Sequence, residues 1–486
     1  MKMVRSYVMG ETKRVKIALV NPPPPSPLAF VDYQYPLIGL AYMAAVLEKN
    51  GYDVAVVDCP ALKMTYKQAE HAIRLFEPDI VGITSVAATF TSALQIARDM
   101  KERYSQALIV FGGPHVTVMD EQIIRDHGEV DIIVRGEGEQ TIADLAHCVS
   151  NSGSKSLNKV KGITFRKETS LVRTPDRPLI EKLDELPFPA YHYFPLRKYQ
   201  IFGKLGLPMV TSRGCVSQCT FCSVPQIAGK HVRARSPKNV VDELVWIRDE
   251  YKADFITFTD EVFTYEKERV LEICSEIKRR KLKVPWDCQT RADCVSREVL
   301  AKMRSANCQL VSFGVESGSQ KMLNAMKKGT TVQQNEMAIK WAKETGLSVI
   351  IYLIVGYPGE TKESLKQTFD FIKKTEPDDV YMYLATPYPS TELGDLVKDT
   401  CWKISRDWSH YEMQTPVFEK AGLSFEKINN EREIFYNDLY SPSYILRQSL
   451  KGTIYSQIMM QNALHQLLWR IKLPWLSANF KKLIRL

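Results

Sequence analysis

Three cysteines in one short loop are the residues of this sequence with the clearest chemistry. Cys215, Cys219 and Cys222 form a C-x3-C-x2-C pattern directly after a predicted strand. Three thiolates from one tight loop can bind three irons of a [4Fe–4S] cluster, which leaves the fourth iron free for a substrate or cofactor. A structural zinc site needs four ligands, and the nearest fourth candidate is His231. The spacing predicts a metal centre and favours the iron–sulfur cluster, with zinc or incidental thiols as the alternative.

Charged residues follow other predicted strands in the same half of the chain. Asp260 and Glu261 are adjacent, so in a strand only one of them can face a site, and we favour Glu261. Glu316 follows a buried apolar strand, where a carboxylate needs a partner. Arg291 ends another strand and can pair with a ligand carboxylate or form a structural ion pair. These side chains are the candidates for a binding site around the cysteine loop.

The elements that must position these residues form two series of alternating strands and helices. The strands expected in the first series are Val15–Val20, Val54–Val57, Ile80–Thr84, Ala107–Phe111 and Asp131–Val134. Those of the second are Met209–Thr211, Phe255–Thr259, Asp287–Thr290, Leu310–Gly314, Val349–Val355 and Val380–Ala385. Apolar strands that alternate with helices indicate parallel sheets covered on both faces. Six such units in the second series suggest a partial (β/α) barrel, with its chemistry at the carboxyl ends of the strands. A more polar segment with one hairpin, residues 151–195, separates the two series.

The first series ends its strands in residues suited to a ligand, because ligands bind beyond the carboxyl ends of parallel strands. Glycine pairs allow close approach of the backbone, and N–H groups at helix starts can bind phosphate. The alternative is a Rossmann-like domain whose glycines only make turns. The strand-end candidates are Asn21, Ser85, Gly112, Gly113, His115, Glu137 and Gly138.

Composition narrows the class of protein. The 486 residues are 45% hydrophobic and 25% charged, which indicates folded domains, and two or three of them at this length. A net charge of +9 does not by itself indicate a nucleic-acid partner. The sequence has no apolar run of the roughly 18 residues that a membrane span needs, and no signal peptide is recognisable. We therefore expect a cytoplasmic protein that does not bind nucleic acid.

The C-terminal tail differs from the rest of the chain. After Asp438 no acidic residue occurs, and the apolar residues near the end recur on one helical face with basic residues toward the other. Such a segment can lie on an anionic membrane, or it can dock on the barrel and close its lower end. The residues concerned are Leu476, Phe480, Leu483 and Ile484 on the apolar face and Lys481, Lys482 and Arg485 on the other.

Further motifs in register with the cysteine loop resemble the radical S-adenosylmethionine (SAM) superfamily. An aromatic residue, Phe221, precedes the last cysteine. The segments FTDEVF, GVESGS, LIVGYPGET and ATPYPSTELG are similar to family segments at the ends of barrel strands. The resemblance implies that Cys215, Cys219 and Cys222 bind a [4Fe–4S] cluster. It also implies SAM contacts from Phe221, Glu261, Arg291, Glu316 and Gly356.

The N-terminal phrases VNPPPP, GGPH and RGEGEQT resemble the cobalamin-binding branch of that superfamily. The branch implies that the strand-end candidates of the first series contact cobalamin. The D-x-H-x-x-G motif, whose histidine binds cobalt, is absent, so no histidine ligand to cobalt is expected. His115 is interpreted as a loop residue near the corrin.

The implied fold class is α/β. A Rossmann-like cobalamin-binding domain (1–150) and a linker (151–195) precede a partial (β/α)6 TIM-type barrel (196–400) and a mostly helical, basic C-terminal region (401–486). The implied activity is C-methylation through a 5′-deoxyadenosyl radical, on a small-molecule or lipid substrate and with a donor such as flavodoxin or ferredoxin supplying the electron. A cyclase of the same branch is the second hypothesis, and a non-catalytic cobalamin or iron–sulfur sensor is the third. A tRNA methylthiotransferase is disfavoured, because the N-terminal domain has only Cys59 and Cys148.

Overall fold

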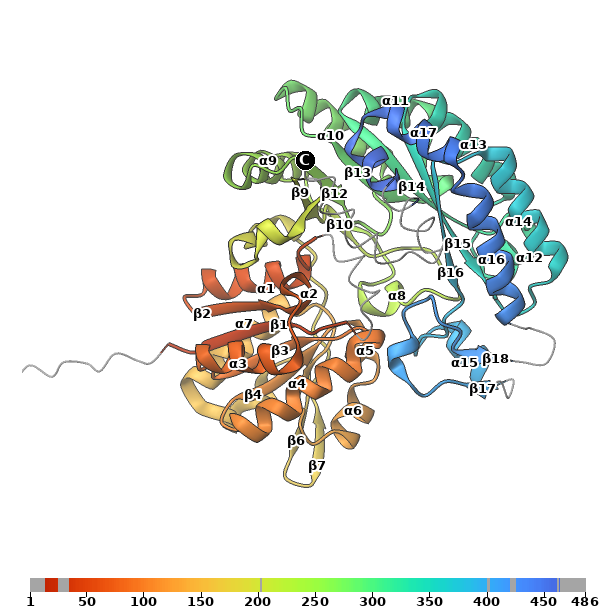
Figure 1. Cartoon of the computed structure of the whole chain (residues 1–486). Helices are drawn as coiled ribbons and strands as arrows, with labels where there is room; N and C mark the ends of the chain where they lie inside the picture. Colours follow the sequence, from red (N-terminus) through yellow and green to blue (C-terminus); the bar gives the residue numbers. More distant parts are fainter. Residues whose placement is uncertain are drawn as a thin grey trace, which may run out of the picture.

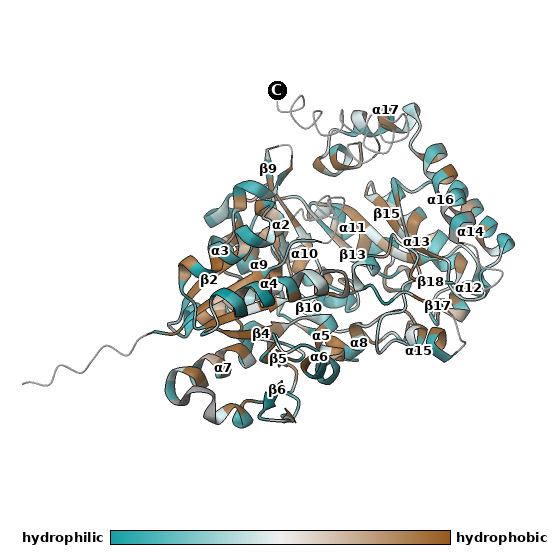
Figure 2. Ribbon diagram, turned by 60° about the horizontal axis from the view of Figure 1, so that its bottom comes forward, coloured by the Kyte–Doolittle hydropathy of each residue, from teal (hydrophilic) through white to brown (hydrophobic). Residues whose placement is uncertain are grey.

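The computed structural model describes residues 14–24, 35–201, 203–399, 403–419, 425–460 and 463. Figure 1 shows two α/β units side by side, with the C-terminal helices packed on the second unit. Figure 2 shows hydrophobic residues along the strands and hydrophilic residues on the outer helices. None of the helices in these ranges is long and apolar enough to cross a membrane.

The first unit is a seven-stranded sheet in the order β2-β1-β3-β4-β5-β6-β7. Its parallel strands are β1 (Lys16–Asn21), β2 (Asp53–Asp58), β3 (Ile80–Thr84), β4 (Leu108–Gly112) and β5 (Ile132–Val134). Helices α1 (Ile38–Lys49) and α7 (Glu139–Ser152) cover one face. Helices α3 (Tyr66–Phe76), α4 (Phe90–Arg103) and α6 (Asp120–Asp126) cover the other. The expected Rossmann-like arrangement is confirmed.

The predicted hairpin is present as β6 (Ile163–Lys167) and β7 (Ser170–Arg173), and it belongs to the first sheet. Strand β6 pairs antiparallel with β5, so the sheet continues to Arg173, beyond the boundary expected near residue 150. Polar residues concealed this extension in the sequence, because an edge hairpin has one solvated face and lacks a continuous apolar run.

The second unit is a curled sheet in the order β16-β15-β14-β13-β12-β9-β8. Six strands are parallel: β9 (Lys204–Met209), β12 (Phe255–Phe258), β13 (Trp286–Thr290), β14 (Cys308–Glu316), β15 (Ser348–Val355) and β16 (Asp379–Leu384). The short β8 (Gln200–Ile201) is antiparallel to β9. The intervening helices are α9 (Pro237–Trp246), α10 (Lys267–Arg279), α11 (Arg297–Ser305), α12 (Gln320–Ala325), α13 (Val332–Glu344), α14 (Lys362–Thr375) and α15 (Glu392–Asp399). The predicted partial barrel is confirmed.

One predicted strand of the barrel, Met209–Thr211, is displaced. Strand β9 ends at Met209, because the backbone N–H of Thr211 donates to the Asp260 carboxylate at 2.6 Å instead of to a neighbouring strand. The cysteine loop that follows is bounded by two short antiparallel strands, β10 (Ser212–Arg213) and β11 (Arg233–Ala234).

The last part of the C-terminal region that the structure describes, residues 440–459, covers the end of the barrel opposite to the strand carboxyl ends. Helices α16 (Phe425–Leu439) and α17 (Pro442–Lys451) follow a small ladder of β17 (Lys403–Ile404) and β18 (Phe418–Glu419). The Tyr440 hydroxyl donates to Asp379, the first residue of β16, at 2.7 Å. Beyond α17, Ile454, Tyr455 and Met459 pack on Phe255 and Leu310. The apolar face predicted at 476–484, whether it docks on the barrel or lies on a membrane, lies outside the described residues.

Candidate functional site

The cysteine loop lies at the carboxyl ends of the barrel strands, between β10 and α8 (Val224–Ile227). A glycine is required at its start, because Gly214 has φ +93° and an added Cβ would lie 2.2 Å from the carbonyl oxygen of His231. Thr220 anchors the middle of the loop. Its N–H donates to the Met326 carbonyl at 3.0 Å, and its hydroxyl lies 2.7 Å from that of Tyr357.

Cationic side chains surround the thiols. The Arg291 guanidinium donates toward Cys219 Sγ at 3.8 Å and is held by Asp293 at 2.8 and 2.9 Å. Burial raises the pKa of Cys219, and the charges of Lys328 and Arg291 pull it back down. Burial also raises the pKa of Cys222 to about 11. Burial thus disfavours the thiolate of Cys219, and the two nearby cations offset part of that effect.

The described residues include no group of three His, Cys, Asp or Glu side chains that could hold a single metal ion. A zinc site needs four ligands around one ion, whereas in a cluster each cysteine binds a different iron. His231, the fourth candidate for zinc, is 58% exposed and faces Glu181.

Glu316 has a protein partner that the sequence did not reveal. It lies just beyond a bulge in the β14–β15 pairing, with φ +66°. Its carboxylate accepts from Lys328 Nζ at 2.7 Å, and both side chains are buried. Lys328 follows α12, whereas its partner Glu316 ends β14. Because the two residues belong to different elements, no local sequence pattern predicts their ion pair. Gly314 makes room for the pair, because a Cβ there would lie 2.7 Å from Glu316 Oε1.

Asp260 has a structural role, whereas the carboxylate of Glu261 is accessible. Strand β12 ends at Phe258, so both lie in the following turn. The buried Asp260 accepts from the Thr211 backbone and from the Thr211 and Ser212 hydroxyls, at 2.5–2.6 Å. Glu261 is only half-buried; burial raises its pKa, and the backbone N–H of Gly214 lowers it. The structure thus places Glu261 beside the cysteine loop, as the sequence favoured.

Gly356 and Phe221 lie on the β16 side of the loop. Gly356 has φ +77°, and its N–H donates to the Glu360 carboxylate at 2.5 Å. Burial raises the pKa of Glu360 to about 7. Phe221 is partly buried and packs against an apolar cluster that includes Tyr357 and Leu393. The five expected SAM residues are therefore distributed around one end of the barrel.

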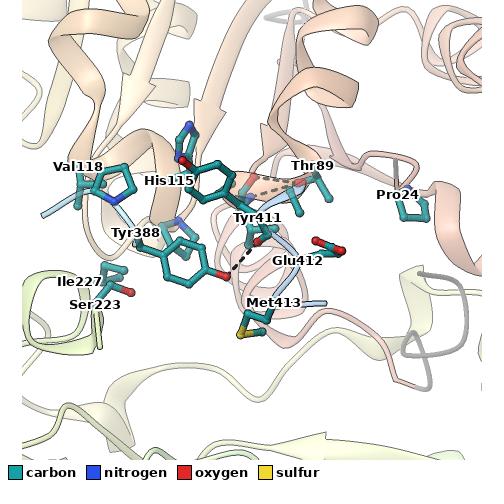
Figure 3. A pocket seen from close by; sticks show the side chains of 15 residues that line it. Pro24, Thr89, His115, Val118, Ser223, Ile227, Tyr388, Tyr411, Glu412 and Met413 are labelled. Carbon is teal, nitrogen blue, oxygen red and sulfur yellow. Dashed lines mark hydrogen bonds between the residues drawn. The ribbon is translucent and has the colours of Figure 1, made fainter. Parts of the chain in front are cut away.

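A cavity of about 390 Å³ separates the two units (Figure 3). From the first unit it is lined by loops after β1, β3 and β4, including Ala87 and His115. From the barrel it is lined by Ser223, next to the last cysteine, and by Tyr388. The residues are mainly apolar, as an apolar-faced macrocycle requires. The complete lining is Pro24, Val86, Ala87, Ala88, Thr89, Pro114, His115, Val118, Ser223, Ile227, Tyr388, Pro389, Tyr411, Glu412 and Met413.

His115 is the unusual polar group of this cavity. It is 4% exposed, and neither ring nitrogen has a hydrogen-bond partner among the described residues. Its ring lies 4.8 Å from that of Phe90 and 4.5 Å from that of Trp408. Burial lowers the pKa of His115 to about 4, so the ring is neutral at physiological pH. An unpartnered neutral imidazole at the cavity wall fits a site that a polar-edged cofactor completes.

Four strand-end candidates, Asn21, Ser85, Gly112 and Gly113, are not among the residues that line the cavity. Gly113 has φ +107°, and a Cβ would lie 2.7 Å from the Ser85 carbonyl oxygen, so the glycine brings the β3 and β4 loops together. Gly112 has open space where a Cβ would lie. The buried Asn21 amide donates to Asp58 at 3.1 Å, and Asp58 also accepts from Tyr199.

Glu137 lies elsewhere, between the two units. Its carboxylate accepts from Arg213 at 3.1 Å, from Arg233 at 2.9 Å and from the Ile180 backbone at 2.7 Å. Gly138 lies against Met43, and an added Cβ would lie 3.2 Å from the sulfur of that residue. Neither residue is among those that line the cavity. Both residues follow a strand, as the sequence predicted. The sequence did not show that two arginines of the barrel unit bind the Glu137 carboxylate.

The fold and the site define an α/β protein with a cysteine loop at the end of a partial barrel, and comparisons identify its family. Residues 28–146 match the B12 binding domain, and residues 209–372 match the Radical SAM superfamily. A Pyrococcus horikoshii protein named as an uncharacterized methyltransferase is 34% identical over 88% of this chain and 93% of its own length. The anaerobic magnesium-protoporphyrin IX monomethyl ester cyclase of Rubrivivax gelatinosus is 30% identical over 88% of this chain and 78% of its own.

A solved structure shares the fold. OxsB, a cobalamin-dependent radical SAM enzyme solved with aqua-cobalamin and SAM, superposes with a TM-score of 0.72 at 19% identity, over 94% of this chain and 72% of that one. The chain belongs to the cobalamin-dependent radical SAM family and is an enzyme of its methyltransferase-like group. Its cofactors are a [4Fe–4S] cluster, SAM and cobalamin.

Proposed function

We propose that this enzyme transfers a methyl group to an unactivated carbon of a hydrophobic substrate. The cavity carries the proposal, because the loops of the cobalamin domain and the residue next to Cys222 line the same space. When bound, the reduced cluster and SAM supply a 5′-deoxyadenosyl radical that removes hydrogen from carbon, and cobalamin supplies the methyl group.

In this proposal Cys215, Cys219 and Cys222 hold the cluster. Arg291 and the Lys328–Glu316 pair set the charge around it, since both cations lower the pKa of Cys219. Binding of SAM is assigned to Phe221, Glu261, Arg291, Glu316 and Gly356. The half-buried Glu261 carboxylate beside Gly214 is available for an amino group, and Gly356 has φ +77°, a conformation that favours glycine.

The cobalamin contacts are assigned to the loops after β1, β3, β4 and β5. His115 lines the corrin space as a neutral donor or acceptor, and Ser85, Gly112 and Gly113 shape the loop behind it. Asn21 acts through Asp58. Glu137 and Gly138 contribute by holding this domain in place.

A hydrophobic substrate is favoured by the apolar lining of the cavity and by one relative. The hopanoid C-3 methylase of Methylococcus capsulatus is 25% identical over 81% of this chain. An acidic one-electron donor of the flavodoxin or ferredoxin kind is proposed to reduce the cluster. A cyclase reaction without methyl transfer is the second candidate, because the Rubrivivax cyclase aligns with most of the chain.

Product counting tests the proposal. The enzyme is reconstituted anaerobically with iron, sulfide and cobalamin, and incubated with SAM, a reductant and lipid extracts. Methylation gives equal amounts of 5′-deoxyadenosine and S-adenosylhomocysteine, together with a product heavier by one CH₂ group. 5′-Deoxyadenosine without S-adenosylhomocysteine, accompanied by a ring-closed product, would instead establish the cyclase.

A further inference from the structure

Two glutamates of the cobalamin domain bind two arginines at the base of the cysteine loop. Glu139 accepts from Arg213 at 2.6 Å, and Glu137 accepts from Arg213 at 3.1 Å and from Arg233 at 2.9 Å. These four side chains are at most 13% exposed. Glu139 is the first residue of α7 and Glu137 lies just before that helix, whereas the arginines belong to the barrel unit.

The arginines are presented together by the local backbone. Arg213 in β10 and Arg233 in β11 are opposite each other in a two-residue antiparallel ladder. This ladder closes the loop that contains the three cysteines, because Cys215 is only two residues beyond Arg213. Arg233 also donates to the Ala228 carbonyl at 2.7 Å, inside the loop. A displacement of the glutamates would therefore be transmitted to the cysteine loop.

Ile180 and Tyr42 make further contacts with these charged side chains. The Ile180 backbone, in the segment that joins the two units, donates to Glu137 at 2.7 Å and accepts from Arg233 at 2.8 Å. The Arg213 guanidinium also lies 5.3 Å from the centre of the Tyr42 ring in α1. Glu137 and Glu139 are thus bound by protein groups, so both carboxylates already have partners without a cofactor.

We propose that Glu137, Glu139, Arg213 and Arg233 form an interdomain clamp that sets the distance between cobalamin and the cluster. They are positioning residues, which act through the cysteine loop and the loops of the cobalamin domain. The inference rests on the proposed use of both cofactors in one reaction. Methyl transfer between two domains requires a defined geometry, and buried charge pairs have a narrow range of favourable geometries.

A spectroscopic distance measurement tests the clamp without turnover. The reconstituted enzyme with cob(II)alamin and the reduced cluster contains two paramagnetic centres, and pulsed dipolar EPR measures the distance between them. In Glu137→Gln/Glu139→Gln we expect the distance distribution to broaden at least twofold. The control Arg98→Gln removes an ion pair within the cobalamin domain, with Glu129 at 2.8 Å, and should keep the native distribution. A native distribution in the double variant overturns the proposal.

Charge reversal provides the rescue. Arg213→Glu should broaden the distribution in the same way, and adding Glu139→Arg should narrow it again. Recovery in the reversed pair would show that the effect of Arg213 runs through its ion pair with Glu139. If a variant does not retain both cofactors, hydrogen exchange of the full chain decides. Faster exchange at 212–234 and 136–142 together supports the clamp, and unchanged exchange overturns it.

The failure of the clamp and the failure of the proposed function give different results. Absence of methylated product with a narrow native distance distribution leaves the clamp intact and removes only the assigned reaction. Normal methylation in the glutamine variant with an unchanged distribution removes only the clamp. Under the proposal, the ratio of S-adenosylhomocysteine to 5′-deoxyadenosine falls at least tenfold in the glutamine variant.

Discussion

Replacing Lys328 with methionine should destabilise the barrel strongly and weaken SAM binding. Lys328 Nζ is 2.7 Å from Glu316 Oε1, and the two side chains are 6% and 9% exposed. Methionine keeps the length of the side chain and removes its charge, which leaves the Glu316 carboxylate buried without its cation. Breaking a buried pair in this way costs about 3–5 kcal/mol. For a domain of this size, that corresponds to a fall in the unfolding midpoint of roughly 6–20 °C.

The neighbouring lysine supplies a matched control. Lys327 forms an ion pair with Glu392 at 2.6 Å, but both side chains are 56% exposed, so Lys327→Met should cost no more than about 1 kcal/mol. Thermal unfolding of both variants, anaerobically and at one scan rate, compares the pairs directly. Lys328→Met combined with Glu316→Leu should recover part of the loss, because both charges are then removed. Equal midpoints for Lys327→Met and Lys328→Met would show that the buried pair contributes no more to stability than the exposed pair.

Four further predictions concern the cofactors, pH and the tail. Replacing all three loop cysteines with alanine should abolish both the cluster of ~4 irons per chain and SAM cleavage, as iron analysis and product assays would show; a persistent cluster contradicts the assignment. The Co(II) EPR spectrum should lack nitrogen superhyperfine splitting from a histidine, and its presence would identify a histidine ligand. Burial raises the pKa of Asp287 from 3.8 to about 7, so the folded state holds this proton where the unfolded state has lost it. Stability should therefore fall as pH rises from about 4 to about 7. In Asp287→Asn the thermal midpoint should depend less on pH over this range. The same pH dependence in the variant and the native enzyme would contradict the prediction. Flotation with anionic liposomes at low salt should recover the full chain but not one truncated after Leu473, and equal recovery in the soluble fraction would leave only a docking role.

The barrel and its cysteine loop could be predicted because their signals are local. Apolar runs of strand length located β12–β16 to within about two residues at each end, since burial on both faces requires a continuous apolar segment. The cysteine spacing is a property of one loop, and the helices between strands follow from their periodicity. The sequence likewise predicted that Glu261, Arg291 and Glu316 lie at strand ends.

The partners of these residues were not readable, because they come from distant parts of the chain. Asp260 resembled Glu261 in the sequence, and only the approach of Thr211 and Ser212 made it structural. Glu316 was expected to need a partner, and Lys328 provides it from beyond the next helix. The hairpin at 163–173 could be predicted from its turn, but not the sheet that it joins.

The sequence by itself determined the two α/β units, the cysteine loop and the family motifs, all of which depend on neighbours within a few residues or on strand and helix periodicity. The tertiary structure decided how the two units meet. Glu137 is 76 residues from Arg213 and 96 from Arg233, and their contact exists only because two separate strand ends face each other across the interface. Ion pairs between residues so far apart produce no periodic pattern in the sequence. A glutamate that forms such a pair cannot be distinguished in the sequence from one on a solvated loop. The cavity between the units, with His115 in its wall, arises in the same way.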